Sequence, residues 1–443
     1  MFLLVNLRKE ERSLLYYITA FLAVGVLVLY LGQPEFNTAY ELALSSGYKL
    51  PFWWFVVLLS IGTMTAFWLV SVYWRVAGFK CDPYLMPITA SLTALGLIFL
   101  FRLRPQYAER QFAWLLLGLL ALVMVTTLLR KMDWLADYKY IYVAAGVILL
   151  VLPIFFGREQ YGARSWLDLG ILQIQPSEFV KLLLVTFLAS FLAENRRVLS
   201  TGNDQILGIS IPGIREYGPL VVMWGISLLI LVFQKDLGTA LIYFCTFLAM
   251  VYAATARMFY VFVGMLLFFF GGTVAYHIFS HVQARVDIWL NPWAYISDKG
   301  YQIVQSLFAI GSGGLFGSGL GQGLPGLIPA VHTDFIFSAI VEELGLLGGC
   351  AVLVLYMCFI FRGLMIALSC RDDFSALLAT GFTALMGLQT FIIIAGVIKL
   401  LPMTGVTLPF ISYGGSSLVA NFVLLGLLLN ISHEVNGGNE TEY

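Results

Sequence analysis

The sequence predicts an all-α membrane protein, a polytopic bundle of about 12 transmembrane helices with one large extracytoplasmic loop. Of its 443 residues, 60% are hydrophobic and 11% are charged, whereas soluble domains average about 45–50% and about 25%. This composition excludes an ordinary soluble protein and a disordered chain. The formal net charge of +0 also gives no electrostatic footprint for nucleic acid.

The predicted spans succeed one another along the chain, and each approaches the roughly 20 apolar residues that a bilayer requires. The first follows Arg8, Lys9 and Arg12 and is too long for a signal-peptide core, so we expect a retained signal anchor. The five cysteines are scattered and predict neither disulfides nor a zinc site. The spans are about 13–32, 51–74, 84–101, 111–129, 139–156, 176–193, 219–233, 236–254, 257–279, 344–368, 375–398 and 413–432.

Basic residues orient the bundle, because cytoplasmic loops are enriched in lysine and arginine. With the N-terminus inside, fourteen basic residues lie on the cytoplasmic side and ten outside. We therefore predict that both termini are cytoplasmic. Arg102, Arg104 and Arg110 share one short external turn. They either bind an anion on the outer side or anchor the bundle at the interface.

The segment at about 280–334 is the largest predicted external loop. It carries eight glycines between Gly311 and Gly326, together with Trp289, Trp293 and Tyr301, and a loop of this length is usually functional or disordered. Its apolar and aromatic content argues against disorder. We expect an amphipathic stretch at Gln302–Ile310 to lie in the outer interface and the loop to contribute to a substrate cleft.

Ionisable groups within or beside spans are costly, so each is a functional candidate. Arg164 and Trp166 precede Gln175-Pro176, where Pro176 suits the first turn of a helix. Glu178 and Lys181 are three residues apart, share a helix face and predict a structural ion pair. Trp166 fits the outer aromatic belt, and Arg164 beside it fits a lipid phosphate.

A second cluster forms the tight external turn at Gln234–Thr239. Asp236 is a good N-cap for the next span, and capping is its simplest role. Lys235 adds an outside cation that the turn does not require.

A third cluster runs from Pro329 through His332, Thr333 and Asp334 into Glu342-Glu343. Asp334 lies where a polar loop becomes an apolar helix, so it is either an N-cap or a functional carboxylate. A helix rises about 1.5 Å per residue, which puts Glu342 roughly 12 Å deeper. Two or three carboxylates then descend into the bundle, and spacing alone does not decide between structural pairs and a site.

A fourth cluster, Lys399–Gly405 and Leu408–Ser417, interrupts apolar sequence with two prolines and three glycines. Non-helical backbone at membrane depth must be buried or line a cavity. We expect either a re-entrant wall around a polar site or a patch of small residues that packs helices.

Together these clusters resemble the SEDS family (shape, elongation, division and sporulation), which includes the RodA and FtsW proteins of bacterial cell-wall synthesis. The resemblance covers about 84–432, and the ending and the KLLPMTG segment look closer to the RodA-like members. One departure is Lys235, where the family often has proline. The matching stretches are GARSWLDLGILQIQPSEFVKL, QKDLGTAL, GYQIVQSLFAIGSGGLFGSGLGQG, VHTDFIFSAIVEELG and LPMTGVTLPFISYGGSS.

The resemblance implies a peptidoglycan glycosyltransferase that polymerises lipid II, the undecaprenyl-diphosphate-linked precursor, at the outer face of the bacterial cytoplasmic membrane. The essential aspartate of the family falls on Asp334, which would act as general base in an inverting transfer. The diphosphate leaving group needs positive charge, and a divalent cation (Mg or Mn) held by Asp334 could share that task. The expected substrate-binding residues are Arg110, Arg164, Trp166, Gln175, Lys235, Gln305, Ser306, His332, Thr333, Lys399, Ser412 and Ser416.

The family also implies a class B penicillin-binding protein as partner and a core of ten helices. The domain prediction is therefore an extra transmembrane pair in 1–80, a glycosyltransferase core in 81–433 and a cytoplasmic tail in 434–443. Two other functions compete with the enzyme: a lipid II flippase, and a scaffold that activates the penicillin-binding protein. A flippase has no obvious use for an outer-side base, and a scaffold predicts that Asp334→Asn keeps function.

Overall fold

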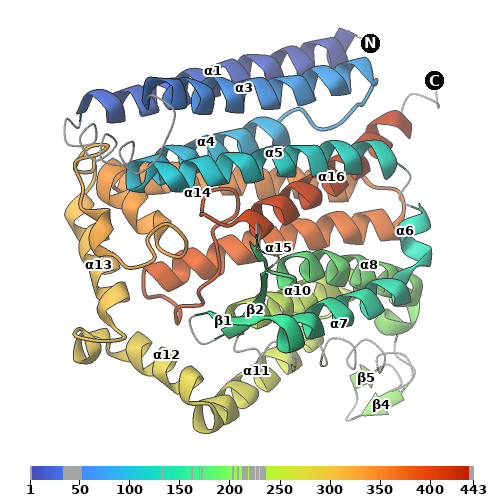
Figure 1. The fold of residues 1–443 in the computed structure, drawn as a ribbon. Coiled ribbons are helices and arrows are strands. Elements are labelled where there is room, and N and C mark those ends of the chain that lie inside the picture. The colour runs from blue at the N-terminus through green and yellow to red at the C-terminus, as the bar shows by residue number, and fades with distance from the viewer. Residues whose placement is uncertain are drawn as a thin grey trace. The chain divides into compact units, whose positions relative to one another are not determined.

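The structure, a computed structural model, describes residues 2–32, 52–130, 133–160, 163–168, 173–201, 204–206, 209–211 and 236–438, with the single residues 170, 218, 225 and 229. Helices dominate this part of the chain (Figure 1). The chain divides into two compact units. The predominance of helices follows from the composition, because a helix satisfies its own backbone hydrogen bonds where no water is available.

Unit 1 comprises Met1–Thr127, Tyr295–Arg362 and Thr407–Gly426. Its elements are α1 (Phe2–Gly32), α3 (Phe52–Val76), α4 (Leu85–Leu103), α5 (Pro105–Leu128), α13 (Tyr301–Gly313), η2 (Pro325–Leu327), most of α14 (Ile336–Ser369) and the first half of α16 (Gly415–Gly438).

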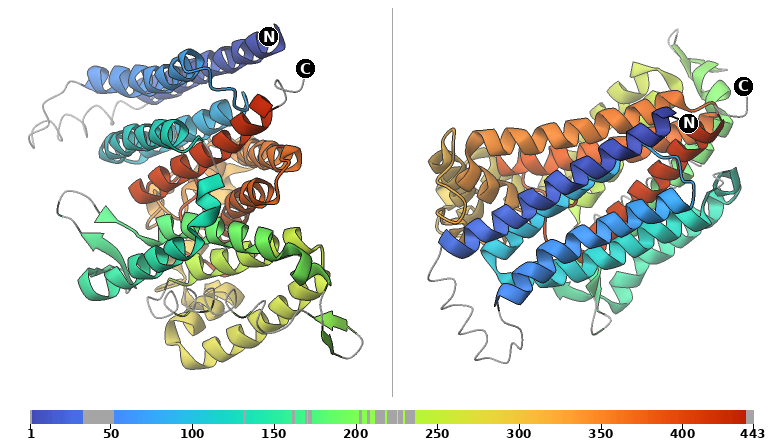
Figure 2. Two further views of the ribbon diagram at one scale, coloured as in Figure 1. Left: turned by 90° about the vertical axis from the view of Figure 1, so that its right-hand side faces the viewer. Right: turned by 90° about the horizontal axis from the view of Figure 1, so that it is seen from above.

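The two N-terminal helices pack side by side, and α1 also packs along α4 (Figure 2). Leu22 and Val26 of α1 and Leu59 of α3 are almost fully buried in this packing. Gly25 allows the close approach of α1 to α4, because a Cβ there would lie 2.7 Å from Ile98 Cδ1. The helices nevertheless leave a cavity of about 10 Å³.

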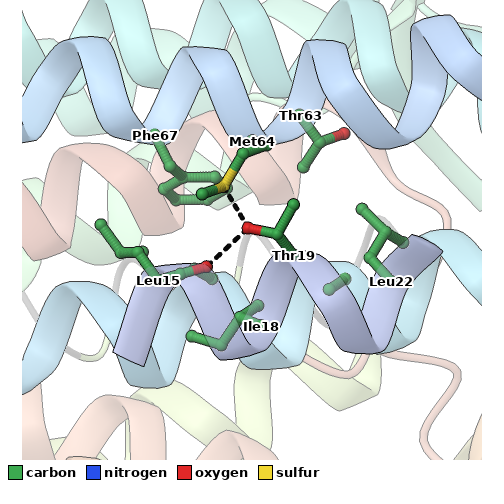
Figure 3. Close-up of a pocket in the computed structure, with 9 residues that line it drawn as sticks. Leu15, Ile18, Thr19, Leu22, Thr63, Met64 and Phe67 are labelled. Atoms are coloured by element: carbon green, nitrogen blue, oxygen red, sulfur yellow. Dashed lines mark hydrogen bonds between the residues drawn. The ribbon is translucent and has the colours of Figure 1, made fainter. Parts of the chain in front are cut away.

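This cavity is lined mainly by apolar side chains of α1 and α3 (Figure 3). The Thr19 hydroxyl donates a hydrogen bond to the Leu15 carbonyl at 2.6 Å and also contacts the Met64 sulfur. A space of this size holds at most about one water molecule. It is therefore a packing defect and not a substrate site.

Unit 2 comprises Leu128–Ala294, Gly363–Val406 and Leu427–Tyr443. Its elements are α6 (Asp133–Asp137), α7 (Lys139–Phe156), β1 (Arg158–Gln160), β2 (Ala163–Asp168), β3 (Gln173–Ile174), α8 (Ser177–Thr201), β4 (Asp204–Ile206), β5 (Ile209–Ile211), α10 (Leu237–Thr255), α11 (Met258–Ile278), α12 (Ser280–Leu290), η1 (Pro292–Tyr295) and α15 (Asp373–Val397).

Helix α8 forms the core of unit 2 and packs against α7, α10 and α15. Its apolar side chains Val185, Leu188 and Leu192 are fully buried. The sequence did not predict the two small antiparallel sheets, β1-β2-β3 and β4-β5. In the first sheet Arg158 pairs with Trp166, and Asp168 pairs with Gln173.

Eleven of the twelve predicted spans coincide with helices of the described chain, and the remaining one, 219–233, lies largely outside the described residues. Nine of the described helices are long and apolar enough to cross a membrane. The all-α polytopic architecture is therefore confirmed.

One boundary prediction was wrong. The span predicted at 344–368 is α14, which begins at Ile336 and is broken at Gly345, where φ is 70°. The segment predicted as an external loop, 280–334, contains α12 and α13 at residues 280–290 and 301–313, and α13 includes the predicted amphipathic stretch Gln302–Ile310. Irregular backbone in that segment is concentrated in the glycine-rich part that follows α13.

Candidate active site

Asp334 lies in a turn of unit 1, two residues before α14 begins. The backbone amides of Thr333 and Asp334 both donate to the Ala330 carbonyl, at 3.1 and 3.2 Å. Ala330 adopts a φ of 55°, in the left-handed region that costs an alanine roughly 1–2 kcal/mol. Val331 and Phe335 are buried on either side of the turn. The turn is thus held in place while Asp334 itself is only half-buried.

The segment at 408–414 fixes the turn by hydrogen bonds to its backbone. The Tyr413 amide donates to the His332 carbonyl at 2.9 Å, and the Ser412 hydroxyl donates to the Thr333 carbonyl at 2.5 Å. The same hydroxyl accepts from the Leu408 amide at 2.9 Å. Ser412 therefore links both segments next to Asp334.

Gln111 of α5 holds the other side of that segment. Its Nε2 donates to the Ser412 carbonyl at 3.0 Å, and its Oε1 accepts from the Gly414 amide at 3.2 Å. Gln111 is 1% exposed, so losing either bond would leave a buried polar group unpaired. The irregular backbone expected in the fourth cluster is present here, and Ile411 and Ser412 are buried.

An aromatic cluster covers the backbone just before Asp334. The rings of Tyr107 and His332 stack with centroids 4.3 Å apart and an interplanar angle of 14°. Tyr413 lies 5.2 Å from the Tyr107 ring and 5.8 Å from that of His332. The Arg104 guanidinium lies 5.9 Å from the Tyr107 ring centre. Burial, and then the charge of Arg104, lower the pKa of His332 below its usual value.

The lowered pKa of His332 predicts acid sensitivity. In the unfolded chain, His332 takes up a proton near its ordinary pKa of about 6.5. In the folded chain it does so only at a lower pH. The free energy of unfolding therefore falls as the pH drops from the ordinary pKa toward the lowered pKa of folded His332. Thermal unfolding at pH 7, 6 and 5 should show a smaller decline for His332→Gln than for the wild type. An identical decline of His332→Gln and the wild type would contradict the prediction.

The other carboxylates of the third cluster, Glu342 and Glu343, lie in the last turn of α14 before its break at Gly345. Both face the glycine-rich segment. Glu343 pairs with Arg102 through Oε1 and Nε at 3.0 Å. Glu342 Oε1 accepts from the Leu324 amide at 2.7 Å. These contacts favour structural pairing. They also show that Arg102 does not join Arg104 and Arg110 as an outward cation.

The remaining predicted site residues of unit 1 fall into two groups. Arg110 is exposed on α5 and lies three residues after Tyr107, on the same helix face. Gln305 is half-buried on α13. Ser306 and Ser416 are buried, and the Ser306 hydroxyl lies 2.7 Å from that of Ser338, where α13 packs against α14. In this structure these two serines are packing residues and offer little surface to a substrate.

A buried polar network occupies the core of unit 2. Lys181 Nζ lies 2.5 Å from Glu178 Oε2 and 2.9 Å from Gln389 Oε1. Gln175 Nε2 donates to Asp236 Oδ2 at 3.3 Å. The Asp236 side chain also accepts from the Thr239 amide, so the predicted N-cap of α10 is present.

Helix α12 holds the segment Lys399–Gly405 of unit 2 through hydrogen bonds to its backbone. Arg285 Nη1 donates to the carbonyls of Met403 and Thr404 at 3.0 and 2.9 Å. Trp289 Nε1 donates to the carbonyl of Lys399 at 3.2 Å, and Lys399 has a φ of 63°. The Lys399 side chain is half-buried.

Two predicted diphosphate ligands cannot be placed. The backbone of Arg164 belongs to β2, and Trp166 on the same strand is half-buried. The side chain of Arg164 and the whole of Lys235 lie outside the described residues.

The sequence did not reveal Tyr107, Gln111 and Tyr413 as neighbours of Asp334. Tyr107 and Gln111 lie more than 200 residues before Asp334, and no local pattern marks such contacts. The one sequence feature near Tyr107 and Gln111 that pointed to a site was the basic turn with Arg102, Arg104 and Arg110. Within the described residues, no three His, Cys, Asp or Glu side chains gather closely enough to hold a metal ion.

Comparison with known proteins identifies relatives that share these segments. A family model described as "Cell cycle protein", named for FtsW, RodA and SpoVE, matches residues 83–437. The chain is 44% identical over 365 residues to "Peptidoglycan glycosyltransferase RodA" of Mycobacterium tuberculosis H37Rv, covering 80% of this chain and 78% of the relative. It is 40% identical over 436 residues to the protein of the same name from Mycobacterium leprae, covering 96% and 90%.

Solved structures show the same architecture. One belongs to work described as "Structural coordination of polymerization and crosslinking by a peptidoglycan synthase complex". It matches with a TM-score of 0.69 at 30% identity, over 80% of this chain and 98% of its own. The rod shape determining protein RodA of Thermus thermophilus matches with a TM-score of 0.57 at 30% identity, over 80% and 97%.

Proposed function

The chain belongs to the FtsW, RodA and SpoVE family of cell cycle proteins and is a multi-pass peptidoglycan glycosyltransferase, and we propose that it polymerises lipid II with Asp334 as general base. The observation that carries the proposal is the placement of Asp334. It is the half-buried carboxylate of a turn whose backbone is fixed by Ser412 and Tyr413 and covered by the Tyr107–His332 stack.

The proposed reaction joins two lipid-linked sugars. The carboxylate of Asp334 takes the proton of the acceptor 4-hydroxyl as that oxygen attacks the anomeric carbon of the donor. The new C–O bond forms with inversion while the bond from the anomeric carbon to the diphosphate oxygen breaks. Undecaprenyl diphosphate leaves, and because a diphosphate is a weak base it requires positive charge rather than a general acid.

The fixed turn supports this role because a general base must reach its proton at about 2.6–3.2 Å. A misplacement of about 1 Å can cost roughly 10²-fold in rate. Thr333 and His332 use their carbonyls to hold the turn, so we expect them to shape the acceptor side. A divalent cation would find in Asp334 one carboxylate and would need substrate oxygens for its other ligands. No step is assigned to such an ion.

The proposal includes an orientation in the membrane and a protein partner. We propose that both termini lie in the cytoplasm and that Asp334 lies at the outer face of the cytoplasmic membrane, because the distribution of basic residues follows the positive-inside rule. A class B penicillin-binding protein is proposed as partner, because the structural match comes from a complex described as coordinating polymerisation and crosslinking.

The stoichiometry of the reaction tests the proposal. One undecaprenyl diphosphate is released for each bond formed, whereas a flippase or a scaffold releases none. Purified chain incubated with labelled lipid II should release undecaprenyl diphosphate in proportion to glycan length. Movement of lipid II across liposomes without any release would instead favour the flippase, and neither activity would favour the scaffold.

The outward cations give a separate prediction about donor binding. Arg110 is exposed on the face of α5 that carries Tyr107, and the backbone of Arg164 belongs to β2. If both bind the diphosphate, the variant with alanine at both positions should bind lipid II roughly 10-fold or more weakly, since hydrogen bonds to charged groups contribute about 1.5–3 kcal/mol. The affinity of the wild type and the variant for nanodiscs that contain lipid II measures this difference. An unchanged affinity would remove both residues from the donor site.

A further inference from the structure

The glycine-rich segment 313–324 of unit 1 is folded back onto the first turns of α14. The amides of Ser318 and Gly319 donate to the carbonyls of Glu342 and Glu343 at 2.9 and 3.0 Å. On the far side of the break in α14, the Leu346 amide donates to the Gly314 carbonyl at 2.9 Å. The break at Gly345 thus exposes backbone groups that the segment satisfies.

Glycine is required at two points of this contact where φ is positive. Gly317 has a φ of 83°, and a Cβ there would lie 2.2 Å from the Glu343 carbonyl oxygen. Gly345 has a φ of 70°, and a Cβ there would lie 2.4 Å from the Leu315 carbonyl oxygen. The two backbones are therefore in direct contact, and this part of the segment has little freedom to shift.

Arg102, in the last turn of α4, holds the next part of the segment. Its Nη2 donates to the carbonyls of Gly321 and Gly323 at 3.1 and 2.9 Å, while its Nε pairs with Glu343. Glu343 Oε2 in turn accepts from the Gly321 amide at 2.9 Å. The side chains of Arg102 and Glu343 are 15% and 0% exposed, so water screens this pair weakly.

The chain around the turn between α4 and α5 also contacts residues next to Asp334. Arg102 lies in the last turn of α4, and five residues later Tyr107 in α5 stacks on His332. The turn between α4 and α5 therefore holds the chain at 321–323 through Arg102 and at 332 through Tyr107. Between these points run η2 and the turn that carries Asp334.

We propose that Arg102 and Glu343 are positioning residues for Asp334, acting through the glycine-rich segment that they clamp. The inference rests on the proposed function of Asp334 as the base. Neither residue touches the reacting atoms. Their role is to hold the glycine-rich segment against α14, so that the turn with Asp334, which follows this segment in the chain, keeps its position.

The chemistry of arginine suits this clamp. A guanidinium offers donors in a planar fork, which here span a carboxylate and two carbonyls. Lysine has one nitrogen and cannot reproduce this geometry. Without Arg102, the Glu343 carboxylate would remain buried without its cation, beside the buried carboxylate of Glu342 near Gly323. We expect the segment to move away to admit water.

The test compares kcat, KM for lipid II and thermal stability for Arg102→Ala, Arg102→Lys and Glu343→Ala in the complex with the penicillin-binding protein. Per folded enzyme, we expect kcat to fall about 10- to 100-fold in the alanine variants while KM changes less than about 3-fold. Arg102→Lys should recover part of kcat. Hydrogen exchange should rise in peptides covering 318–334.

Arg362→Ala is the matched control. It breaks a comparably buried pair with Asp82, whose side chains are 30% and 4% exposed, nineteen residues further along α14. It should lower stability but leave kcat per folded enzyme unchanged. Equal kcat in the Arg102, Glu343 and Arg362 variants, with equal exchange at 318–334, would overturn the proposal.

The same assay separates this proposal from the proposed function. An inactive Asp334→Asn together with a fully active Arg102→Ala would refute the positioning role and leave the base intact. An active Asp334→Asn would refute the base, and with it the meaning of any effect at Arg102.

Discussion

Replacement of Asp334 by asparagine is expected to reduce lipid II polymerisation by roughly 10²–10⁴-fold, the usual contribution of a general base. Asparagine keeps the size of the side chain and can still accept a backbone hydrogen bond. The turn that carries residue 334 is fixed by Ser412 and Tyr413 and should survive. The loss should therefore appear in kcat, with lipid II binding and thermal stability close to those of the wild type.

A second aspartate provides the control for this variant. Asp372 caps α15, where its Oδ2 accepts from the Ser375 amide at 2.7 Å. Asp372→Asn also keeps shape and capping, so it should leave polymerisation unchanged. If the two variants have the same rate, Asp334 has only a structural role and the base must be sought elsewhere.

Breaking the buried pair of Glu178 and Lys181 should have the largest effect on stability. Both residues are at most 5% exposed, and Lys181 also donates to Gln389. Lys181→Met would leave the Glu178 carboxylate buried without a cation, which costs about 3–5 kcal/mol. Thermal or denaturant unfolding in detergent should show this loss. Arg196→Ala, which breaks a pair whose side chains are 47% and 52% exposed, should cost at most about 1 kcal/mol.

Exchanging the two charges tests whether the pair itself matters. In the variant with Glu178→Lys and Lys181→Glu, the ion pair can re-form, and the Gln389 amide can turn its NH₂ toward the new carboxylate. We expect this double variant to recover much of the stability that either single variant loses. No recovery would mean that the residues act separately.

Much of the fold was predictable because a helix that crosses a membrane needs a long apolar stretch, which is visible in the sequence. Long apolar stretches marked the helices, and the spacing of Glu178 and Lys181 marked their contact. Asp236 was predicted as a cap because N-caps depend only on residues three positions away. These features are local, and local features can be read from one sequence.

The site was only partly predictable because its contacts are long-range. Asp334 and His332 came from a resemblance, but nothing near them pointed to Tyr107 or Gln111. Spacing also could not show that Glu343 pairs with Arg102 and that Glu342 accepts from the Leu324 amide, nor that α14 is broken at Gly345. Glycine in an apolar run gives no reliable sign of a break, since many such glycines are helical.

The short strands after α7 were not predicted because their sequences carry no clear strand pattern. β1 and β2 are three and six residues long and lack regular alternation. Their pairing depends on a tight return of the chain between two spans. Such small elements are stabilised by the helices around them rather than by their own sequence.

The most direct test of the central claim is a glycan-strand assay with labelled lipid II and the purified complex of this chain with its penicillin-binding protein. Wild type and Asp334→Asn are run side by side after folding and partner binding have been matched. We expect long strands from the wild type and none from Asp334→Asn. Equal strands from both would contradict it and assign polymerisation to another residue or to the partner.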